Sequence, residues 1–386
     1  MSETTASLTS GARFKVFFER NITFLGPLLT LVILVLVFAI LAPSTFLSQR
    51  NLLNVLSQVS VLAILAAGLT FVLLLGQMDL SVATVAVLAG MVSAVIYSGM
   101  PMGFPFIGAV TFPMGNQVVA VIISLLLAAL LGLVSGLITA RLGIPSFIGT
   151  LGMLEIARGL AFYWSDGKNI YDMMPLSEFL GSSFLFAPAG ADGKDGAAPS
   201  GTFPGIPVIV LVAVVTLVIG HIVLTYTRFG RYVYMSGANP KAAQLSGVPV
   251  KRVTTIVFVI SGVLSGFGGI VLIGRIGSAQ ATSGDGLLLP AIAAVVLGGT
   301  SLFGGVGSMK HTAVGLLLYG VLNNGLDQID INIYLKPFAR GVFLLAAIAL
   351  NIAALRVASR ANTRGDGGRS DQPDGPEPVP HMVSST

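Results

Sequence analysis

The feature that most constrains this chain is a series of apolar runs, each long enough to cross a lipid bilayer. A helix needs about 20 apolar residues to span the hydrocarbon core. Ten candidate spans can be drawn along the 386 residues, at 24–42, 55–75, 79–98, 117–140, 144–163, 206–226, 253–274, 288–303, 311–326 and 338–356. We therefore expect an all-α polytopic membrane protein of about ten spans. The stretch 101–113 leaves room for one further span or a re-entrant segment.

Composition supports a membrane protein over a soluble one. Only 10% of residues are charged and 54% are hydrophobic, whereas soluble domains carry about 25% charged residues. The 47 glycines suit closely packed helices in lipid. The chain has no cysteine, so disulfides and thiolate metal sites are excluded. The net charge of +5 does not indicate nucleic-acid binding, because the basic residues are spread over loops that flank the spans.

The distribution of lysine and arginine gives the orientation. With the N-terminus inside, the inside set is Arg13, Lys15, Arg20, Arg141, Arg228, Arg231, Lys241, Lys251, Arg252, Lys310, Arg356, Arg360, Arg364 and Arg369. The outside set is smaller, with Arg50, Lys168, Lys194, Arg275 and Lys336. Cytoplasmic loops of membrane proteins carry the excess of basic residues. Both termini are therefore expected in the cytoplasm.

These spans divide the chain into three parts. Residues 1–23 form a cytoplasmic N-terminal segment, and 24–356 form the transmembrane domain. Within that domain, 164–205 is a long external loop and 227–252 is a basic cytoplasmic loop. The tail 357–386 is polar and rich in glycine and proline, a composition typical of disorder.

The cytoplasmic loop contains a polar island, GANPKAAQLSGVPVKR, at 237–252. Asn239 is a suitable N-cap, Pro240 fits a first helical turn, and Gly247 can end a helix. The sequence thus predicts a short capped helix between two spans. On position alone, an ordinary basic loop is favoured over a docking element.

Chemically similar elements recur in the two halves of the chain. Polar or glycine-rich breaks interrupt apolar runs at 76–81 and 298–305, and an Ala-Arg-Gly follows each, at 157–159 and 339–341. Such weak internal symmetry is typical of transporters with duplicated halves, although chance in a Gly- and Leu-rich chain is an equal alternative. Asp79 is expected to cap the helix that follows its break, or else to lie in a cavity.

One predicted span carries an opposite charge pair. Glu155 and Arg158 are three residues apart and can face each other on a helix. The sequence favours a self-paired lock near the outer membrane face over a substrate contact. Arg340 lies near the outer end of its span and is expected to reach the interface.

The motifs of catalysis are missing from the sequence. There is no phosphate-binding Gly-x-x-x-x-Gly-Lys-Ser/Thr loop, and His221, His311 and His381 have no metal-ligand spacing. No nucleophile–base arrangement is visible, so a membrane enzyme is disfavoured and no catalytic residue or metal site is predicted. Uphill transport would need an ion gradient or an ATPase on another chain.

Five motifs together resemble the permease family of bacterial ABC importers for ribose-, xylose-, arabinose- and galactose-type monosaccharides. The resemblance covers roughly residues 50–350 and is carried by 77–82, 144–152, 156–160, 237–248 and 291–302. The chain departs from the usual family pattern at Gln77 and Ala83, and in the long, glycine-rich stretch 188–205. These departures bear on sugar identity more than on mechanism.

The resemblance implies a permease homodimer or heterodimer in the inner membrane of a bacterium. It also implies a periplasmic sugar-binding protein and a cytoplasmic ATPase pair, which would hold ATP and Mg²⁺ so that this chain binds no cofactor. By the same resemblance, the segment that docks on the ATPase comprises Asn239, Pro240, Lys241, Ala242, Ala243, Leu245, Ser246 and Gly247. The translocation path is expected at the two breaks, at Gln77, Asp79, Ser81, Gly298, Gly299, Thr300 and Ser301, where freed backbone groups can meet sugar hydroxyls.

Two alternatives stay open. The same importer plan could carry a branched-chain amino acid, but a zwitterion needs charged partners and the spans have few unpaired charges. An ion-coupled secondary transporter or channel would work without an ATPase, and the absence of an acidic relay in the spans counts against it.

Overall fold

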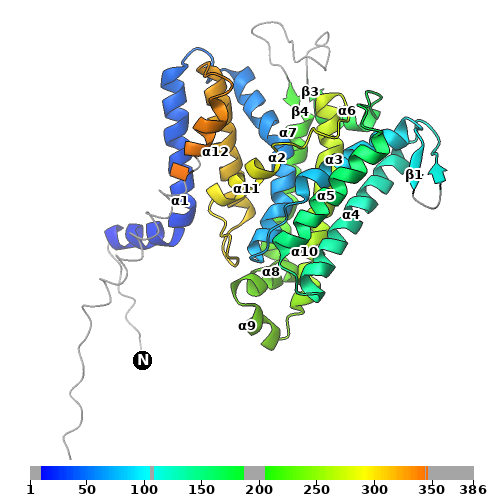
Figure 1. Cartoon of the computed structure of the whole chain (residues 1–386). Coiled ribbons are helices and arrows are strands. Elements are labelled where there is room, and N and C mark those ends of the chain that lie inside the picture. The colour runs from blue at the N-terminus through cyan, green and yellow to red at the C-terminus, as the bar shows by residue number, and fades with distance from the viewer. Residues whose placement is uncertain (1–9, 105–107, 187–204, 344, 347–386) are drawn as a thin grey trace, which may run out of the picture.

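The computed structural model describes residues 10–104, 108–186, 205–343 and 345–346, which form a bundle of long helices (Figure 1). The first half contains α1 (Ser10–Leu41), α2 (Gln49–Leu74), α3 (Val82–Tyr97), α4 (Gln117–Arg141), α5 (Ser146–Ser165) and α6 (Pro175–Ser182). The second half contains α7 (Val208–Tyr226), α8 (Arg228–Ala238), α9 (Pro240–Leu245), α10 (Val250–Ile276), α11 (Leu288–Leu297) and α12 (Met309–Gln328). Two small antiparallel hairpins pair β1 (Met102–Phe104) with β2 (Gly108–Val110), and β3 (Phe184–Leu185) with β4 (Ile206–Pro207).

The long helices coincide with the predicted apolar runs. Within the described chain, α2, α4, α7 and α10 are long and apolar enough to cross a membrane by length and composition. Three shorter apolar helices lie at Leu25–Leu41, Val82–Tyr97 and Leu288–Leu297. A helix also covers 336–343, where the last predicted span begins. The fold is therefore that of a helical, polytopic membrane protein.

Several boundaries differ from the sequence prediction. The run 288–303 is helical only to Leu297, because glycines and a turn occupy 298–308. The stretch 101–113 forms the β1–β2 hairpin instead of a span, because it contains too few consecutive apolar residues. The external loop 164–205 includes the short helix α6. Residues 187–204, 347–356 and the tail 357–386 lie outside the described residues.

Helix α10 is the centre of the bundle and packs along α2, α3 and α4. Small residues allow this close approach, as is common between helices in membranes. A Cβ at Gly269 would overlap the carbonyl oxygen of Ala86 on α3, and one at Gly262 would overlap that of Ala128 on α4. Nearly every side chain of α3 is buried. The core of the bundle is thus built around α3 and α10.

The loops gather at two opposite ends of the bundle (Figure 1). One end holds the α2–α3 and α4–α5 turns, the helices α8 and α9, and the α11–α12 turn. It is called the inner end here, because most of the basic loop residues belong to it. The outer end holds the hairpins and α6. This alternation is what successive membrane crossings predict.

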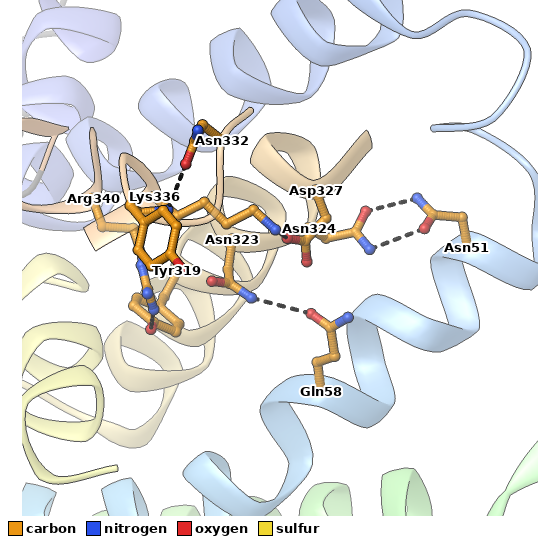
Figure 2. Close-up of polar contacts among 10 residues, drawn as sticks. Asn51, Gln58, Tyr319, Asn323, Asn324, Asp327, Asn332, Lys336 and Arg340 are labelled. Atoms are coloured by element: carbon orange, nitrogen blue, oxygen red, sulfur yellow. Dashed lines mark hydrogen bonds and ion pairs between the residues drawn. The ribbon is translucent and has the colours of Figure 1, made fainter. Parts of the chain in front are cut away.

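A polar clamp joins α2 to α12 at the outer end (Figure 2). Asn51 and Asn324 exchange two amide hydrogen bonds of 2.8 and 2.9 Å, and Gln328 donates to the Asn51 carbonyl oxygen at 2.8 Å. Asn51 and Asn324 are both buried, so each amide satisfies a group that would otherwise be desolvated without a partner. The clamp ties the first half of the chain to the second.

Candidate functional site

The predicted capped helix of the polar island is confirmed as α9. Asn239 accepts a hydrogen bond from the backbone N–H of Ala242 at 3.0 Å, and Pro240 occupies the first position of the helix. Gly247 follows the end of α9 with a φ of 81°, a left-handed conformation that favours glycine. The preceding α8 is capped in the same way by the hydroxyl of Thr227. The side-chain caps at the starts of α8 and α9 stabilise these two short helices.

Helix α9 shows most of its surface to solvent at the inner end. Only Ala243 among its residues is buried, against Val248 and neighbouring apolar side chains. Leu245 is 91% exposed. The structure thus leaves the docking residues predicted by resemblance accessible, namely Asn239, Pro240, Lys241, Ala242, Leu245, Ser246 and Gly247. A large exposed apolar side chain at a rigid tip is typical of a contact surface for a partner.

A glycine junction connects α8 to both polar breaks. A Cβ at Gly237 would overlap the carbonyl oxygen of Leu74, at the end of α2, and would lie 2.8 Å from the N–H of Gly305. The Gly305 N–H itself donates to the Leu74 carbonyl at 2.9 Å. Tyr234 of α8 donates its hydroxyl to the carbonyl of Gly307 at 2.9 Å. Movement of α8 and α9 would therefore bear directly on the end of α2 and on the α11–α12 turn.

The first break, at 76–81, is held by hydroxyl groups of α5. The N–H of Met78 donates to the Ser146 hydroxyl at 2.9 Å, and the N–H of Leu80 donates to the Thr150 hydroxyl at 3.1 Å. Ser146 and Thr150 are one turn apart in the first turns of α5 and both are buried. Two of the sequence motifs, 77–82 and 144–152, are thus partners in one backbone brace. In the sequence, this contact is indicated by two hydroxyl residues, Ser146 and Thr150, that lie four residues apart directly after Pro145.

Asp79 is a buried brace within the same break. One carboxylate oxygen accepts from the Ser81 N–H at 3.0 Å and from the Ser81 hydroxyl at 2.6 Å. The other accepts from the hydroxyl of Ser261 on α10 at 2.8 Å. The side chain is only 3% exposed. Asp79 therefore braces the turn before α3 and joins it to α10. It does not cap α3 as the sequence favoured, because the N-cap is Ser81, which makes no side-chain cap bond.

The second break, at 298–305, is packed against α12. A Cβ at Gly298 would overlap the carbonyl oxygen of His311, and Gly299 has a φ of 108°. Thr300 is buried, and its hydroxyl has no hydrogen-bond partner among the described residues. The hydroxyl of Ser301 accepts from the N–H of Phe303 at 3.1 Å.

The predicted path residues share one location. The structure gathers Gln77, Asp79, Ser81, Gly298, Gly299, Thr300 and Ser301 at the inner end, near the glycine junction. Gln77, Gly299 and Ser301 are partly exposed, whereas the other four are buried. Their role in a translocation path stays a prediction, because their contacts are hydrogen bonds and packing within the protein.

The charge pair on α5 has a third member that the sequence did not reveal. Arg158 lies 3.7 Å from Glu155 and 3.2 Å from Asp285, which belongs to the 277–287 segment before α11. The side chains of Arg158, Glu155 and Asp285 are 43%, 67% and 63% exposed, respectively. Asp285 is 127 residues from Arg158 in the chain. The sequence places it in a polar stretch between two apolar runs, which does not identify Arg158 as its partner.

Arg340 contacts the middle of α12 (Figure 2). Its guanidinium donates to the Tyr319 hydroxyl at 3.1 Å. On the same side, Lys336 forms an ion pair with Asp327. These contacts fasten the helix at 336–343 to α12.

Comparison with known proteins identifies the family. The family model described as "Branched-chain amino acid transport system / permease component" matches residues 51–364. The ribose import permease protein of Bacillus subtilis is 37% identical over 338 residues, which cover 87% of this chain and 95% of the relative. That of Haemophilus influenzae is 36% identical over 320 residues, covering 83% and 90%. The D-allose transport system permease protein of Escherichia coli is 32% identical over 339 residues, covering 88% and 93%.

No solved structure shows significant similarity to the chain. The relatives nevertheless align over nearly their whole length. In this chain, the matched family segment spans the α8–α9 island, both breaks and α5. The chain therefore belongs to the family of transport-system permease components to which this model corresponds, and it is a multi-pass membrane protein.

Proposed function

We propose that this chain is the membrane subunit of an ATP-driven importer that carries a monosaccharide, such as ribose or a related pentose or hexose. The observation that carries this proposal is the full-length similarity to permeases named for ribose and allose import. A neutral sugar also suits the spans better than a branched-chain amino acid, although the family description names the latter. A zwitterion would need separate charged partners, whereas the described charges on α5 are already paired with one another.

The proposed topology has ten spans, with both termini in the cytoplasm of a bacterium and the protein in its inner membrane. The spans are α1, α2, α3, α4, α5, α7, α10, α11, α12 and a last helix that begins at 336. The basic loops that gather at the inner end support this orientation. The two halves of the chain would be related by a weak internal repeat.

The proposed partners follow from what this chain lacks. It has no phosphate-binding loop, so ATP and Mg²⁺ would be bound by a pair of cytoplasmic ATPase subunits, and this chain is not itself an enzyme. A second permease, identical or similar, would complete the path. A periplasmic binding protein would deliver the sugar to the outer end.

In the proposed cycle, ATP binding closes the ATPase pair and moves α9, which rests on the ATPase through Leu245 and its neighbours. The glycine junction transmits this movement from α8 to the end of α2 and to the α11–α12 turn. The bundle then alternates between inward-open and outward-open states, and hydrolysis resets it. This transmission needs rigid contact at Gly237, where no side chain separates α8 from Leu74.

A pull-down from mild detergent tests the proposal. The tagged chain is expected to bring down an ATPase whose turnover rises when a binding protein loaded with ribose or allose is added. Replacing the exposed Leu245 with Asp should abolish co-purification without changing the folded state of the chain. The similarly exposed Tyr334, 87% accessible, lies in the turn before the helix at 336–343 and provides a control variant away from α9, Tyr334→Asp, which should retain the ATPase. Transport by the chain alone, driven by an ion gradient, would overturn the proposal.

A further inference from the structure

Helix α5 has one buried face and one open face. The buried face packs on α3 and α4 through Thr150, Met153, Ala157, Ala161 and Trp164. The open face carries the exposed residues Ile148, Leu151, Gly152, Glu155, Gly159 and Phe162. A Cβ at Gly152 or Gly159 would meet no atom within 4 Å. The backbone of α5 is therefore accessible along this face.

The charges on this face lie well inside the predicted membrane depth. Arg158 is seven residues from the outer end of α5 at Ser165, which corresponds to about 10 Å along the helix. Charged side chains at such a depth are costly in lipid and almost always face a bundle interior or a water-filled cavity. By contrast, the outward row of α4 is wholly apolar, with Val118, Ile122, Leu126 and Leu130 exposed. The two helices thus face different surroundings.

The segment 277–287 supports a wet cavity beside these charges. It starts at the outer end, where Ala279 pairs with Ile170 through 2.8 and 3.0 Å backbone hydrogen bonds. It then runs in turns to Gly284, which packs on Ala83 in the first turn of α3, near the inner break. Irregular backbone at membrane depth is tolerated only where it is buried in protein or lines a water-filled cavity. Thr282 and Asp285 are exposed, so this segment fits the second case.

A shallow hollow of about 390 Å³ adjoins Glu155 on the other side of the open face. Its lining is Glu155, Ile156, Gly159, Leu160, Tyr163 and Trp164. The hollow is open to the surface, and Glu155 is the charged residue in its lining. Carboxylates accept hydrogen bonds from sugar hydroxyls, a guanidinium donates to them, and an aromatic ring packs on the apolar face of a sugar. Glu155 thus lies between this hollow on one side and Arg158 with Asp285 on the other.

We propose that Glu155, Arg158 and Asp285 form the sugar-contacting site of the translocation path, on the open face of α5. This inference rests on the proposed function and deepens it by assigning the residues that meet the sugar. One guanidinium between two carboxylates leaves the site with a net charge of −1. The site therefore accepts neutral sugars and repels anionic ones such as sugar phosphates. A second permease facing this surface would double that charge and close the path from lipid.

The first test measures import by the reconstituted complex with the variants Glu155→Gln, Arg158→Gln and Asp285→Asn. The number of sugars imported per ATP hydrolysed should fall by about tenfold, because removing a charge weakens the hydrogen bonds between this site and the sugar hydroxyls. The ratio of ribose to allose uptake should also shift, which a merely structural role would not produce. The matched control is Asp166→Asn, which removes an exposed ion pair with Lys168 of 2.7 Å outside the spans and should leave import unchanged.

A second test does not depend on the folding of charge variants. The chain has no cysteine, so single cysteines can be placed as Gly159→Cys on the open face of α5 and Ile122→Cys on the apolar row of α4. A small, membrane-impermeant maleimide should label Cys at 159 at least about tenfold faster than at 122, and saturating ribose should slow only the former. Equal labelling of both positions would overturn the inference.

The two proposals fail in different ways. If the wild-type complex imports ribose or allose with ATP while the three variants keep their uptake ratio and sugar yield, only the site assignment is wrong. If the wild-type complex imports no monosaccharide, the proposed function is wrong and the site assignment is lost with it.

Discussion

Two carboxylates in this apolar bundle, Asp79 and Glu155, occupy opposite surroundings. Asp79 is buried and accepts hydrogen bonds from one backbone N–H and two hydroxyls. Glu155 has a side chain that is 67% exposed and a single 3.7 Å ion pair. Asp79 is therefore part of a buried structural brace, whereas the charged face of α5 is open. A carboxylate within the bundle can thus brace the structure or lie on an open face, and the exposed fraction of its side chain distinguishes the two cases.

The largest expected effect of a substitution lies in the glycine junction on the closed side. In Gly237→Val the added side chain would overlap the Leu74 carbonyl, and backbone cannot yield as a flexible side chain can. Overpacking costs about 1–3 kcal/mol and sometimes more, so we expect loss of the folded protein or a large fall in the unfolding temperature in detergent. Gly159→Val on the open face meets no atom and should keep the wild-type unfolding temperature. Equal stability of the two variants would remove the distinction between the regions.

Asp79→Ala should have the next largest effect. It would orphan three donors in the interior, at a cost of about 1–3 kcal/mol for a buried group left unsatisfied. Glu155→Ala leaves only an exposed ion-pair partner, and surface substitutions usually change stability by less than about 0.5 kcal/mol. Denaturant or thermal unfolding of the two variants in the same detergent measures this difference. A larger loss in the Glu155 variant would contradict the assignment of a brace to Asp79.

Thr150→Val removes a hydroxyl that accepts from Leu80 and donates to the carbonyls of Ser146 and Met78, and it should have a smaller effect. Valine matches threonine in shape but leaves the Leu80 N–H without its 3.1 Å acceptor, which should cost about 1 kcal/mol or somewhat more. Thr255→Val is a suitable control, because the Thr255 hydroxyl only donates to the Lys251 carbonyl within its own helix. Amide hydrogen exchange at Leu80 gives a local readout, and unchanged protection there would argue against the brace.

Much of the fold was predictable because its determinants are local. Runs of about 20 apolar residues place the long helices, and Asn239, Pro240 and Gly247 define α9 through capping rules that act within a few residues. The close-packed glycines and the location of the breaks were likewise visible as composition. All of these features are determined by residues that are close to one another in the sequence.

The candidate site was less predictable because its partners are distant in sequence. Nothing near Arg158 indicates that it meets Asp285, and nothing near Met78 indicates that its N–H bonds Ser146. The predicted span 288–303 was wrong at its end, because it included the first residues of the glycine-rich break, where the backbone turns in contact with α12. Burial likewise depends on the tertiary structure. The burial of Asp79 changed its interpretation from a helix cap to a brace. The exposure of Glu155 and Arg158 changed the interpretation of this pair from a self-paired lock to part of an open surface.

The most direct test of the account is uptake by proteoliposomes that contain this chain, its co-purifying ATPase and a ribose-loaded binding protein. With ATP on the ATPase side, we expect uptake of radiolabelled ribose that Glu155→Gln strongly reduces while its unfolding temperature stays that of the wild type. Leucine, offered in place of ribose, should not be taken up. ATP-dependent leucine uptake without ribose uptake, or ribose uptake that persists without any ATPase, would contradict the account.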